Sequence, residues 1–481
     1  MYIGVDVGTS ITKAVAFGAD GTQLDVQSVP TKLIHPAPGR IEQDTAEVLA
    51  SVTSVLSALV GRVGQPEFVA VTGQGDGLWL VDADGVPVRN AVSWMDGRAA
   101  QTVRDWTAAG VEEAVFRVNG SIQFPGSPAA IMSYLDEHEP STLDRAATAG
   151  YCKDVVLQHL TGLRATDASD SSMPYSDLNG GYSDVALSAL GLTHRAGLLA
   201  PIHAHQPVGE LHAAGASATG LAAGTPIVSG PYDLPACARG TGVVTPGDGM
   251  VIIGTTLACQ VITASPDTSG TPAGLTLATG APGRWLRAMP AMVGTASLDW
   301  TLRLVGASTG SLAGMLGESG AGANGVSVLP YFSPSGERAP FVDPFARGQF
   351  SGLTVQSTPA DLVRAVCEGI AYAARHCLDA AGLTGSLAVA GGGARSAAWL
   401  QIFADVLGRE LRLPRCSEVG ARGVVVNAFD VVGRAFDEAA WTGSELVVSP
   451  GRDVERYEEG YGRYLAQVGS ARAAWADATV W

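Results

Sequence analysis

The sequence has 481 residues, which is too long for one hydrophobic core and predicts two or more domains. A hydrophobic content of 46% is typical of a soluble globular protein, and no apolar run reaches the roughly 20 residues that a membrane span needs. The net charge of −16 disfavours nucleic acid as a partner, because both would be negatively charged.

The start of the chain and its cysteines and histidines bear on the cellular compartment and on metal binding. The chain starts MYIGVDVG, a strand pattern without the basic and apolar regions of a signal peptide, so we expect a cytoplasmic protein. None of the six cysteines forms a C-x-x-C pair, and we expect reduced, buried thiols. His203, His205 and His212 lie close in sequence, but no Cys or acidic cluster completes a zinc site.

The first half is predicted to open with a β-meander. Residues 2–30 alternate apolar residues around a Gly-Thr-Ser turn and an Asp-Gly turn. Asp44 stands where it would cap a helix that runs to residue 63, and residues 68–88 give a strand, a Gly-rich loop, a strand and a turn. Three further helices are expected within RAAQTVRDW, SPAAIMSYLDEHEP and CKDVVLQHLTG, the last running into Gly162.

The second half repeats the layout of the first. Residues 249–270 again place an apolar strand before a Gly-Thr-Thr turn and a second strand, which suggests an internal duplication. Residues 333–348, SPSGERAPFVDPFARG, are interpreted as an ordered surface loop. A long helix is predicted to end at Gly382, and residues 386–408 read as strand, triple-Gly turn and helix. We place the domain boundary at about residues 240–248.

Two common nucleotide-binding motifs are absent from the sequence. There is no G-x-x-x-x-G-K-[ST] phosphate loop and no G-x-G-x-x-G after the first strand. These absences disfavour a P-loop enzyme and a dinucleotide-binding enzyme.

Gly-Thr-Ser turns after strands are the remaining candidates for phosphate binding, because they can present backbone N–H groups and hydroxyls to phosphate oxygens. In DVGTS, Asp6 would repel phosphates unless Mg²⁺, held through water, stood between them, and Lys13 can reach the same place. The turn GGGARS opens a helix, and its glycines allow a purine close to the backbone. A hairpin with a solvated Asp and a tight strand–helix turn are the structural alternatives.

Two further segments point to hydroxyl chemistry. Gln74 and Asp76 in TGQGDGLWL suit a polyhydroxylated ligand, since a carboxylate can accept from two adjacent hydroxyls, and SWMDGRA adds an aromatic residue beside charges. Asp233 in VSGPYDLPACARGTG precedes a small-residue helix. On the local pattern alone, it is either a helix cap or a carboxylate that takes a proton from a substrate.

In this order and spacing, the motifs of nearly the whole chain resemble those of the FGGY carbohydrate kinases, which include glycerol kinase, xylulokinase, ribulokinase and erythritol kinase. The resemblance rests on DVGTSITKAV, GRIEQD, GQGDG, SWMDGRA, CKDVVLQHLTG, GPYDLPACARGTG, IIGTT, SPSGERAPF, CEGIAYAAR and GGGARSAAWLQIFADVLG. It implies an α/β fold of two ribonuclease-H-like domains, as in actin, Hsp70 and hexokinase, with a cleft between them. Residues 1–244 would bind sugar or polyol and carry the base, and residues 245–481 would bind nucleotide.

The resemblance also implies ATP and Mg²⁺ as cofactors and assigns residues to roles. Asp233 would be the catalytic base, a sugar contact and a candidate Mg²⁺ contact, and the helix dipole is expected to keep it ionised, with Pro235 fixing the first turn. The other implied sugar contacts are Gln74, Asp76 and Trp94. The implied ATP and phosphate contacts are Asp6 (also Mg²⁺ through water), Gly8, Thr9, Ser10, Lys13, Gly254, Thr255, Thr256, Gly294, Gly392, Gly393 and Ser396.

Departures from the better-known family members bear on the substrate. Pentulose kinases typically have Met-His where this chain has Gly75 and Asp76, and glycerol kinases have Arg-Glu, whereas GQGDG looks more like erythritol kinase. The family's usual GG.D is GPYD here, which changes the pocket near Asp233. We therefore expect a terminal hydroxyl of a four-carbon polyol or ketose, such as erythritol, threitol or erythrulose, to be phosphorylated.

Other functions stay open at this point. They are a pentulose or pentitol kinase, an actin- or Hsp70-like ATP-dependent switch, and a non-catalytic sugar-binding regulator. We expect a small-molecule sugar or polyol as the partner and neither nucleic acid nor a membrane, and we leave a homodimer open.

Overall fold

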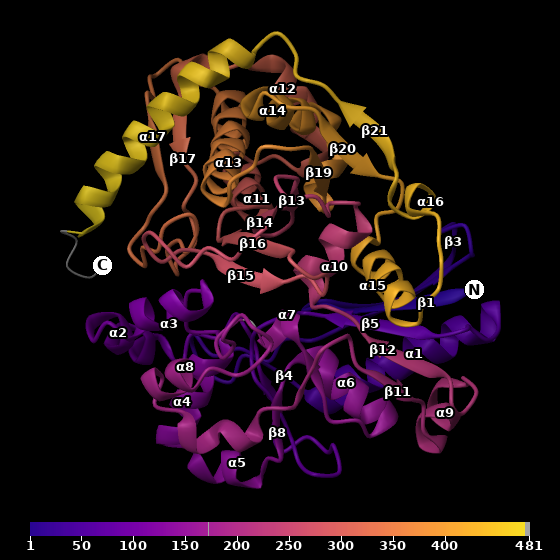
Figure 1. Ribbon diagram of the computed structural model, residues 1–481. Helices are drawn as coiled ribbons and strands as arrows, with labels where there is room; N and C mark the ends of the chain where they lie inside the picture. Colours follow the sequence, from indigo (N-terminus) through magenta and orange to yellow (C-terminus); the bar gives the residue numbers. More distant parts are fainter. Residues whose placement is uncertain (172, 477–481) are drawn as a thin grey trace. The chain divides into compact units, whose positions relative to one another are not determined.

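The computed structural model describes residues 1–171 and 173–476, which fall into two compact units (Figure 1). Unit 1 comprises Met1–Gly242, Ala264–Leu286 and Glu418–Gly443, and unit 2 comprises Val243–Thr263, Arg287–Ser417 and the described residues from Ser444 on. The units are therefore not contiguous stretches, because two later segments pack into unit 1. The domains 1–244 and 245–481 remain a prediction about the functional halves.

The helices and strands of the first half of the chain are, in order, β1 (Tyr2–Val7), β2 (Ile11–Phe17), β3 (Gln23–Pro30), β4 (Glu42–Gln43), α1 (Thr45–Val63), β5 (Val69–Gly73), β6 (Trp79–Val81), β7 (Ala91–Val92), α2 (Ala100–Ala108), α3 (Val111–Asn119), α4 (Pro128–His138), α5 (Pro140–Arg145), β8 (Thr148–Gly150), α6 (Cys152–Thr161), β9 (Thr166–Asp167), α7 (Ala168–Ser171), α8 (Asp184–Ala189), β10 (Ile202–His203), β11 (Val208–Glu210), α9 (Ala213–Thr219), β12 (Pro226–Ser229) and α10 (Asp233–Gly240).

Those of the second half are β13 (Gly249–Ile253), β14 (Leu257–Thr263), β15 (Leu275–Ala278), β16 (Trp285–Ala291), α11 (Thr295–Leu304), α12 (Leu312–Glu318), β17 (Ser327–Leu329), β18 (Gln349–Ser351), α13 (Pro359–Ala381), β19 (Leu387–Ala390), α14 (Ala397–Leu407), β20 (Leu411–Pro414), α15 (Val419–Val431), α16 (Glu438–Thr442), β21 (Ser444–Val448) and α17 (Val454–Ala476). The predicted helix ends at Gly162 and Gly382 are confirmed, and both glycines adopt left-handed backbone conformations.

A six-stranded mixed sheet organises unit 1, in the order β11-β12-β5-β1-β2-β3. The first three strands form the predicted antiparallel meander, and β5 and β12 continue the sheet in parallel. Asp44 caps α1 as predicted, because its carboxylate accepts hydrogen bonds from Ala46 N–H and Glu47 N–H. Helices α1 and α6 pack on this sheet, and α15 packs on β1 and β5.

The alternation of side chains along β1 decides what Asp6 contacts. Ile3, Val5 and Val7 lie in the apolar core that includes α1. Tyr2, Gly4 and Asp6 therefore point to the other face, where α15 lies. A Cβ on Gly4 would stand 2.1 Å from the carbonyl oxygen of Ala421, so only glycine lets α15 approach the strand this closely.

Helices α10 and α15 also approach each other through glycines. A Cβ on Gly423 would lie 1.8 Å from the carbonyl oxygen of Ala236, and one on Gly240 would lie 2.1 Å from that of Val419. The backbones of the two helices are thus in direct contact. This packing fixes α10, which begins with Asp233, against α15, which begins beside Glu418.

Helix α1 is the one described helix whose length and composition would suffice to cross a membrane. Its apolar side chains, including Val48, Val52 and Leu56, are buried in the core of unit 1. This arrangement is that of a core helix.

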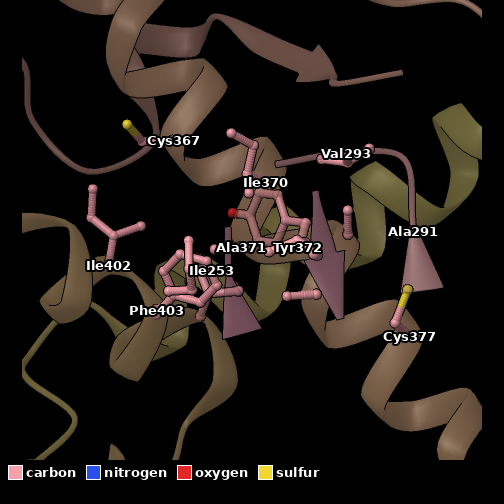
Figure 2. Packing of buried hydrophobic residues seen from close by; sticks show 14 of the residues in the cluster. Ile253, Ala291, Val293, Cys367, Ile370, Ala371, Tyr372, Cys377, Ile402 and Phe403 are labelled. Atoms are coloured by element: carbon pink, nitrogen blue, oxygen red, sulfur yellow. The ribbon is translucent and has the colours of Figure 1, made fainter. Parts of the chain in front are cut away.

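The second sheet has seven strands in the order β15-β16-β14-β13-β19-β20-β21. Strands β13 and β14 form an antiparallel hairpin, and β19 runs parallel to β13. Figure 2 shows Ile253 of β13 together with Ile370 of α13 and Phe403 of α14 in the apolar core of unit 2. Ile253 is the last residue before the predicted Gly-Thr-Thr turn, so this turn is anchored directly on the core.

The loop at residues 333–348 differs from the prediction of a surface loop. Glu337 is 3% exposed, and one of its carboxylate oxygens accepts hydrogen bonds from the backbone N–H groups of Met292, Arg338 and Ala339. Phe341 is buried in the core of unit 2. A charged residue and flanking Pro and Gly suggested exposure, but the backbone donors compensate for burial of the carboxylate.

All six cysteines are free and buried, as expected.

Candidate active site

Asp6 and Lys13 meet on one face of the first hairpin of unit 1. They are register partners of β1 and β2, so their side chains leave the sheet on the same side. The Lys13 ammonium forms a 2.7 Å ion pair with Glu418, which directly precedes α15. A Cβ on Gly420 would lie 2.5 Å from Asp6 Oδ2, so the carboxylate sits against the first turn of that helix.

The surroundings of Asp6 disfavour the ionised form of its carboxyl group. Burial raises the pKa of this carboxyl from 3.8 to about 6; the nearby Lys13 lowers it, and Glu418 raises it. Lys13 is shared with Glu418, so its charge offsets only part of the burial penalty. A carboxylate kept in this place at a cost to its ionisation is a candidate functional group.

Thr9 joins the predicted phosphate turn to the predicted sugar-binding residues. Its hydroxyl donates to Gln74 Oε1 at 3.0 Å and accepts from Trp94 Nε1 at 2.9 Å. The Gln74 amide donates to Gln43 Oε1 at 2.8 Å, and Gln43 in turn donates to the carbonyl of Thr9. The structure thus brings Thr9, Gln74 and Trp94 together, with Gln43 as a fourth member that the sequence patterns did not single out.

Asp76 lies in a loop held in an uncommon backbone conformation. Its φ is 53° and that of Gly77 is 69°, and the Asp76 side chain is buried. Asp96 and Arg98 of the SWMDGRA segment pair with each other at 2.8 Å, and Arg98 also pairs with Glu42. This buried network is structural, since it ties the segments around residues 42 and 96 together.

Asp233 occupies the first position of α10 and is not its N-cap. The N-cap is Tyr232, with extended backbone angles, so the capping role proposed for Asp233 is wrong by one residue. The preceding backbone is fixed by two hydrogen bonds, from Gly230 N–H to Val71 O (2.8 Å) and from Thr72 Oγ1 to Pro231 O (2.7 Å). The end of β5 therefore positions the start of α10.

The surroundings of Asp233 oppose the stabilisation of its anion that was expected from the helix dipole. Burial raises its pKa well above 3.8, and the negative charges of Asp6 and Asp76 raise it further. A hydrogen bond from the backbone of Leu234 acts in the opposite direction, but burial dominates. The same interactions show that Asp6 and Asp76 each lie near enough to Asp233 to affect its pKa.

These three carboxylates bear on the predicted Mg²⁺. In the described part of the chain, no three His, Cys, Asp or Glu side chains are arranged to hold a metal directly. The donor set nevertheless fits Mg²⁺ held through water, because Asp6 and Asp76 lie near enough to Asp233 to raise its pKa and carboxylates are hard oxygen ligands.

In unit 2, the predicted nucleotide turns also come together. The Gly254 N–H donates to Thr256 O across its turn, whereas the Gly8 N–H donates to Ile11 O across the first hairpin turn, which is one residue longer. A Cβ on Gly294 would lie 2.4 Å from the carbonyl oxygen of Thr255, and Thr295 N–H donates to Gly254 O at 2.9 Å. The start of α11 is therefore packed on the Gly-Thr-Thr turn.

The triple-glycine turn follows β19 in the same unit. A Cβ on Gly393 would meet the side chain of Ile253 at 2.3 Å, whereas one on Gly392 would have no neighbour within 4 Å. Ser396 caps α14, with its hydroxyl accepting from Trp399 N–H. Gly392 thus leaves open space at its Cα, which suits close approach of a flat ligand.

A buried charge cluster around Lys153 was not indicated by the sequence patterns. Lys153, 1% exposed at its side chain, lies 2.7–3.0 Å from carboxylates of Asp154, Asp167 and Asp170. Burial raises the pKa of Asp170 well above 3.8. The scarcity of lysine was a signal for Lys153, but nothing in the sequence showed that the three acids surround it.

Comparisons with known proteins agree with this geometry. The sequence pattern of the FGGY family of carbohydrate kinases, N-terminal domain, matches residues 1–240, and that of the C-terminal domain matches residues 249–429. An erythritol kinase of Brucella abortus is 34% identical, with 95% of this chain and 94% of that protein covered. A xylulose kinase of Escherichia coli is 32% identical over 87% of each chain. A ligand-bound xylulose kinase structure from Lactobacillus acidophilus superposes with a TM-score of 0.91 at 21% identity, covering 99% of this chain and 98% of that one.

Proposed function

Because the chain belongs to the FGGY family of carbohydrate kinases, we propose that it is an ATP-dependent kinase of a four-carbon polyol or ketose, such as erythritol, threitol or erythrulose. The observation that carries the proposal is the Gly75-Asp76-Gly77 loop, whose buried carboxylate lies near enough to Asp233 to raise its pKa. The similarity to an erythritol kinase over 95% of the chain supports the same substrate class.

In the proposed mechanism, Asp233 acts on a terminal hydroxyl of the acceptor. Its carboxylate accepts the hydroxyl proton while the oxygen attacks the γ-phosphorus of ATP. The new P–O bond forms as the bond to the bridging oxygen breaks, and the electron pair leaves with ADP. The raised pKa of Asp233 makes its ionised form a stronger base, which suits this proton transfer.

The other predicted residues orient the reactants. Asp76, with Gln74 and Trp94, would hold the acceptor hydroxyls, and Thr9 couples the latter two residues to the phosphate turn. Asp6 and Asp233 would hold Mg²⁺ through water, and the ion would supply charge neutralisation at the phosphates. Lys13 would contribute positive charge beside Asp6.

ATP would be bound by the turns assigned above from the sequence. They are Gly8, Thr9 and Ser10 in unit 1 and Gly254, Thr255, Thr256, Gly294, Gly392, Gly393 and Ser396 in unit 2. Both hairpin turns are closed by a glycine N–H, on Ile11 O in the first and on Thr256 O in the second, which supports the proposal that they perform the same task.

An ATP-coupled screen of polyols and ketoses with three to six carbons tests the substrate. We expect the highest kcat/KM for a four-carbon compound. Strong turnover of a pentulose, with none of any four-carbon compound, would reject the assignment.

A pentulose or pentitol kinase is the second candidate. It is favoured by the 32% identity to a xylulose kinase over 87% of the chain. The Gly75-Asp76 sequence argues against it, and the same screen separates the two candidates.

The proposal carries three further expectations. Residues 1–244 would serve the acceptor and the base, and residues 245–481 would serve the nucleotide. The protein would be cytoplasmic, where ATP is available, and would act on a small molecule without nucleic acid. Its assembly, including a homodimer, is measurable by light scattering.

A further inference from the structure

A side chain at position 75 would overlap with the ring of Tyr232. A Cβ on Gly75 would lie 2.2 Å from Cε2 and 2.4 Å from Cδ2 of Tyr232, where real Cβ contacts do not fall below about 3 Å. Gly75 does not take a positive φ, whereas Asp76 and Gly77 do. Position 75 therefore requires glycine for space, because the ring of Tyr232 stands where its side chain would begin.

The ring cannot easily move aside. Tyr232 is 3% exposed, and its backbone N–H donates to Ser169 Oγ at 3.0 Å. The carbonyl of Pro231 is held by Thr72, and Tyr232 itself is the N-cap of α10. A substitution at position 75 would thus strain a fixed aromatic side chain.

The position of this contact links it to substrate binding more than to general packing. Gly75 stands between Gln74 and Asp76, and Tyr232 directly precedes Asp233. The contact of the ring with Gly75 therefore joins the loop assigned to the acceptor to the residue next to the assigned base.

We propose that Tyr232, paired with Gly75, is a specificity-determining residue that limits the length of the acceptor. The inference rests on the proposed function and deepens it. A rigid aromatic wall leaves little room for an extra carbon, and one methylene in a closely fitting pocket changes kcat/KM by about 10- to 200-fold. A kinase of this fold with any side chain at position 75 would need a smaller residue at position 232.

The test compares kcat/KM for erythritol and xylitol in the wild type and in two variants. Tyr232→Ala removes the ring, and we expect the xylitol-to-erythritol ratio to rise at least 10-fold. Tyr232→Phe keeps the ring, and its ratio should stay within about threefold of wild type. Equal changes for both polyols in Tyr232→Ala would overturn the inference. The wild-type preference itself reports on the proposed function, so the two can fail separately.

A thermal double-mutant cycle tests the contact without relying on turnover. Gly75→Ala should lower the melting temperature of the wild type, and the same change should cost little in the Tyr232→Ala background. Additive shifts would show that residue 75 and the ring do not share space, and would overturn the inference even if neither polyol is phosphorylated.

Discussion

Replacing Asp6 by Asn should make the protein more stable while removing its activity. Burial raises the pKa of Asp6 from 3.8 to about 6, with Lys13 offsetting part of the effect and Glu418 adding to it. Each pKa unit corresponds to about 1.4 kcal/mol, so the ionised carboxylate costs up to about 3 kcal/mol at neutral pH. Partial exposure of Asp6 reduces this, and we expect Asp6→Asn to gain about 1 to 3 kcal/mol at pH 7.

The gain in stability from Asp6→Asn should depend on pH. Because the folded pKa is raised, the contribution of Asp6 to stability is fully present below pH 3.8 and is lost as the pH rises to about 6. The advantage of Asp6→Asn should therefore be small at pH 4 and reach its full size by pH 7. Asn has nearly the same shape as Asp, so the contact with Gly420 is retained.

Scanning calorimetry of both proteins at pH 4 and pH 7 measures the difference, which amounts to roughly 2–4 °C in melting temperature per kcal/mol. Asp20→Asn is the matched control, since Asp20 is an exposed turn residue of the same meander whose pKa is lowered, chiefly by the Thr22 backbone N–H. It should not stabilise the protein. If Asp6→Asn were less stable than wild type at pH 7, the assignment of Asp6 as a strained functional carboxylate would be refuted.

Three further predictions concern helix packing, the buried Glu337 and the pH dependence of activity. Gly423→Ala should lower the free energy of unfolding by about 1–3 kcal/mol, because its Cβ would lie 1.8 Å from Ala236 O. The control Gly462→Ala, which has open space at its Cβ, should not destabilise the protein. Equal melting temperatures for the two variants would contradict the packing of α10 on α15. Burial raises the pKa of Glu337 to about 7, so the free energy of unfolding of the wild type should fall by up to about 3 kcal/mol between pH 4.5 and 7. Urea titrations of the wild type and of Glu337→Gln measure this fall. An equal fall in the variant would contradict the prediction. The kcat/KM should fall at least roughly tenfold from pH 7 to pH 5, because Asp6 is protonated over this range and the pKa of Asp233 is raised as well. A flat profile down to pH 4.5 would show that the charge of Asp6 is not needed.

Local patterns predicted the parts of the fold that depend on neighbours in sequence. The β-meander, the Asp44 cap and the Gly162 and Gly382 helix ends follow from alternation and from backbone conformations that glycine favours. Membership of the FGGY family, seen in the order of the motifs, is confirmed by matches over residues 1–240 and 249–429.

Contacts between distant residues could not be predicted in this way. Glu418 reaches Lys13 across 405 positions, and the ring of Tyr232 fills the space beside Gly75. The raised pKa of Asp233 was not predicted, because a helix start favours its anion, whereas burial and two other carboxylates oppose it. Those opposing effects arise only when β1, the Gln74 loop and α10 are assembled.

The most direct test of the account is the turnover of Asp233→Ala. With ATP and the preferred four-carbon acceptor, we expect kcat to fall at least about 1,000-fold, since proton transfer and alignment at the attacking hydroxyl are lost together. ATP affinity, measured by calorimetry on the same protein, should change less than threefold. A variant that retains near-wild-type turnover would contradict the assignment of Asp233 as the base.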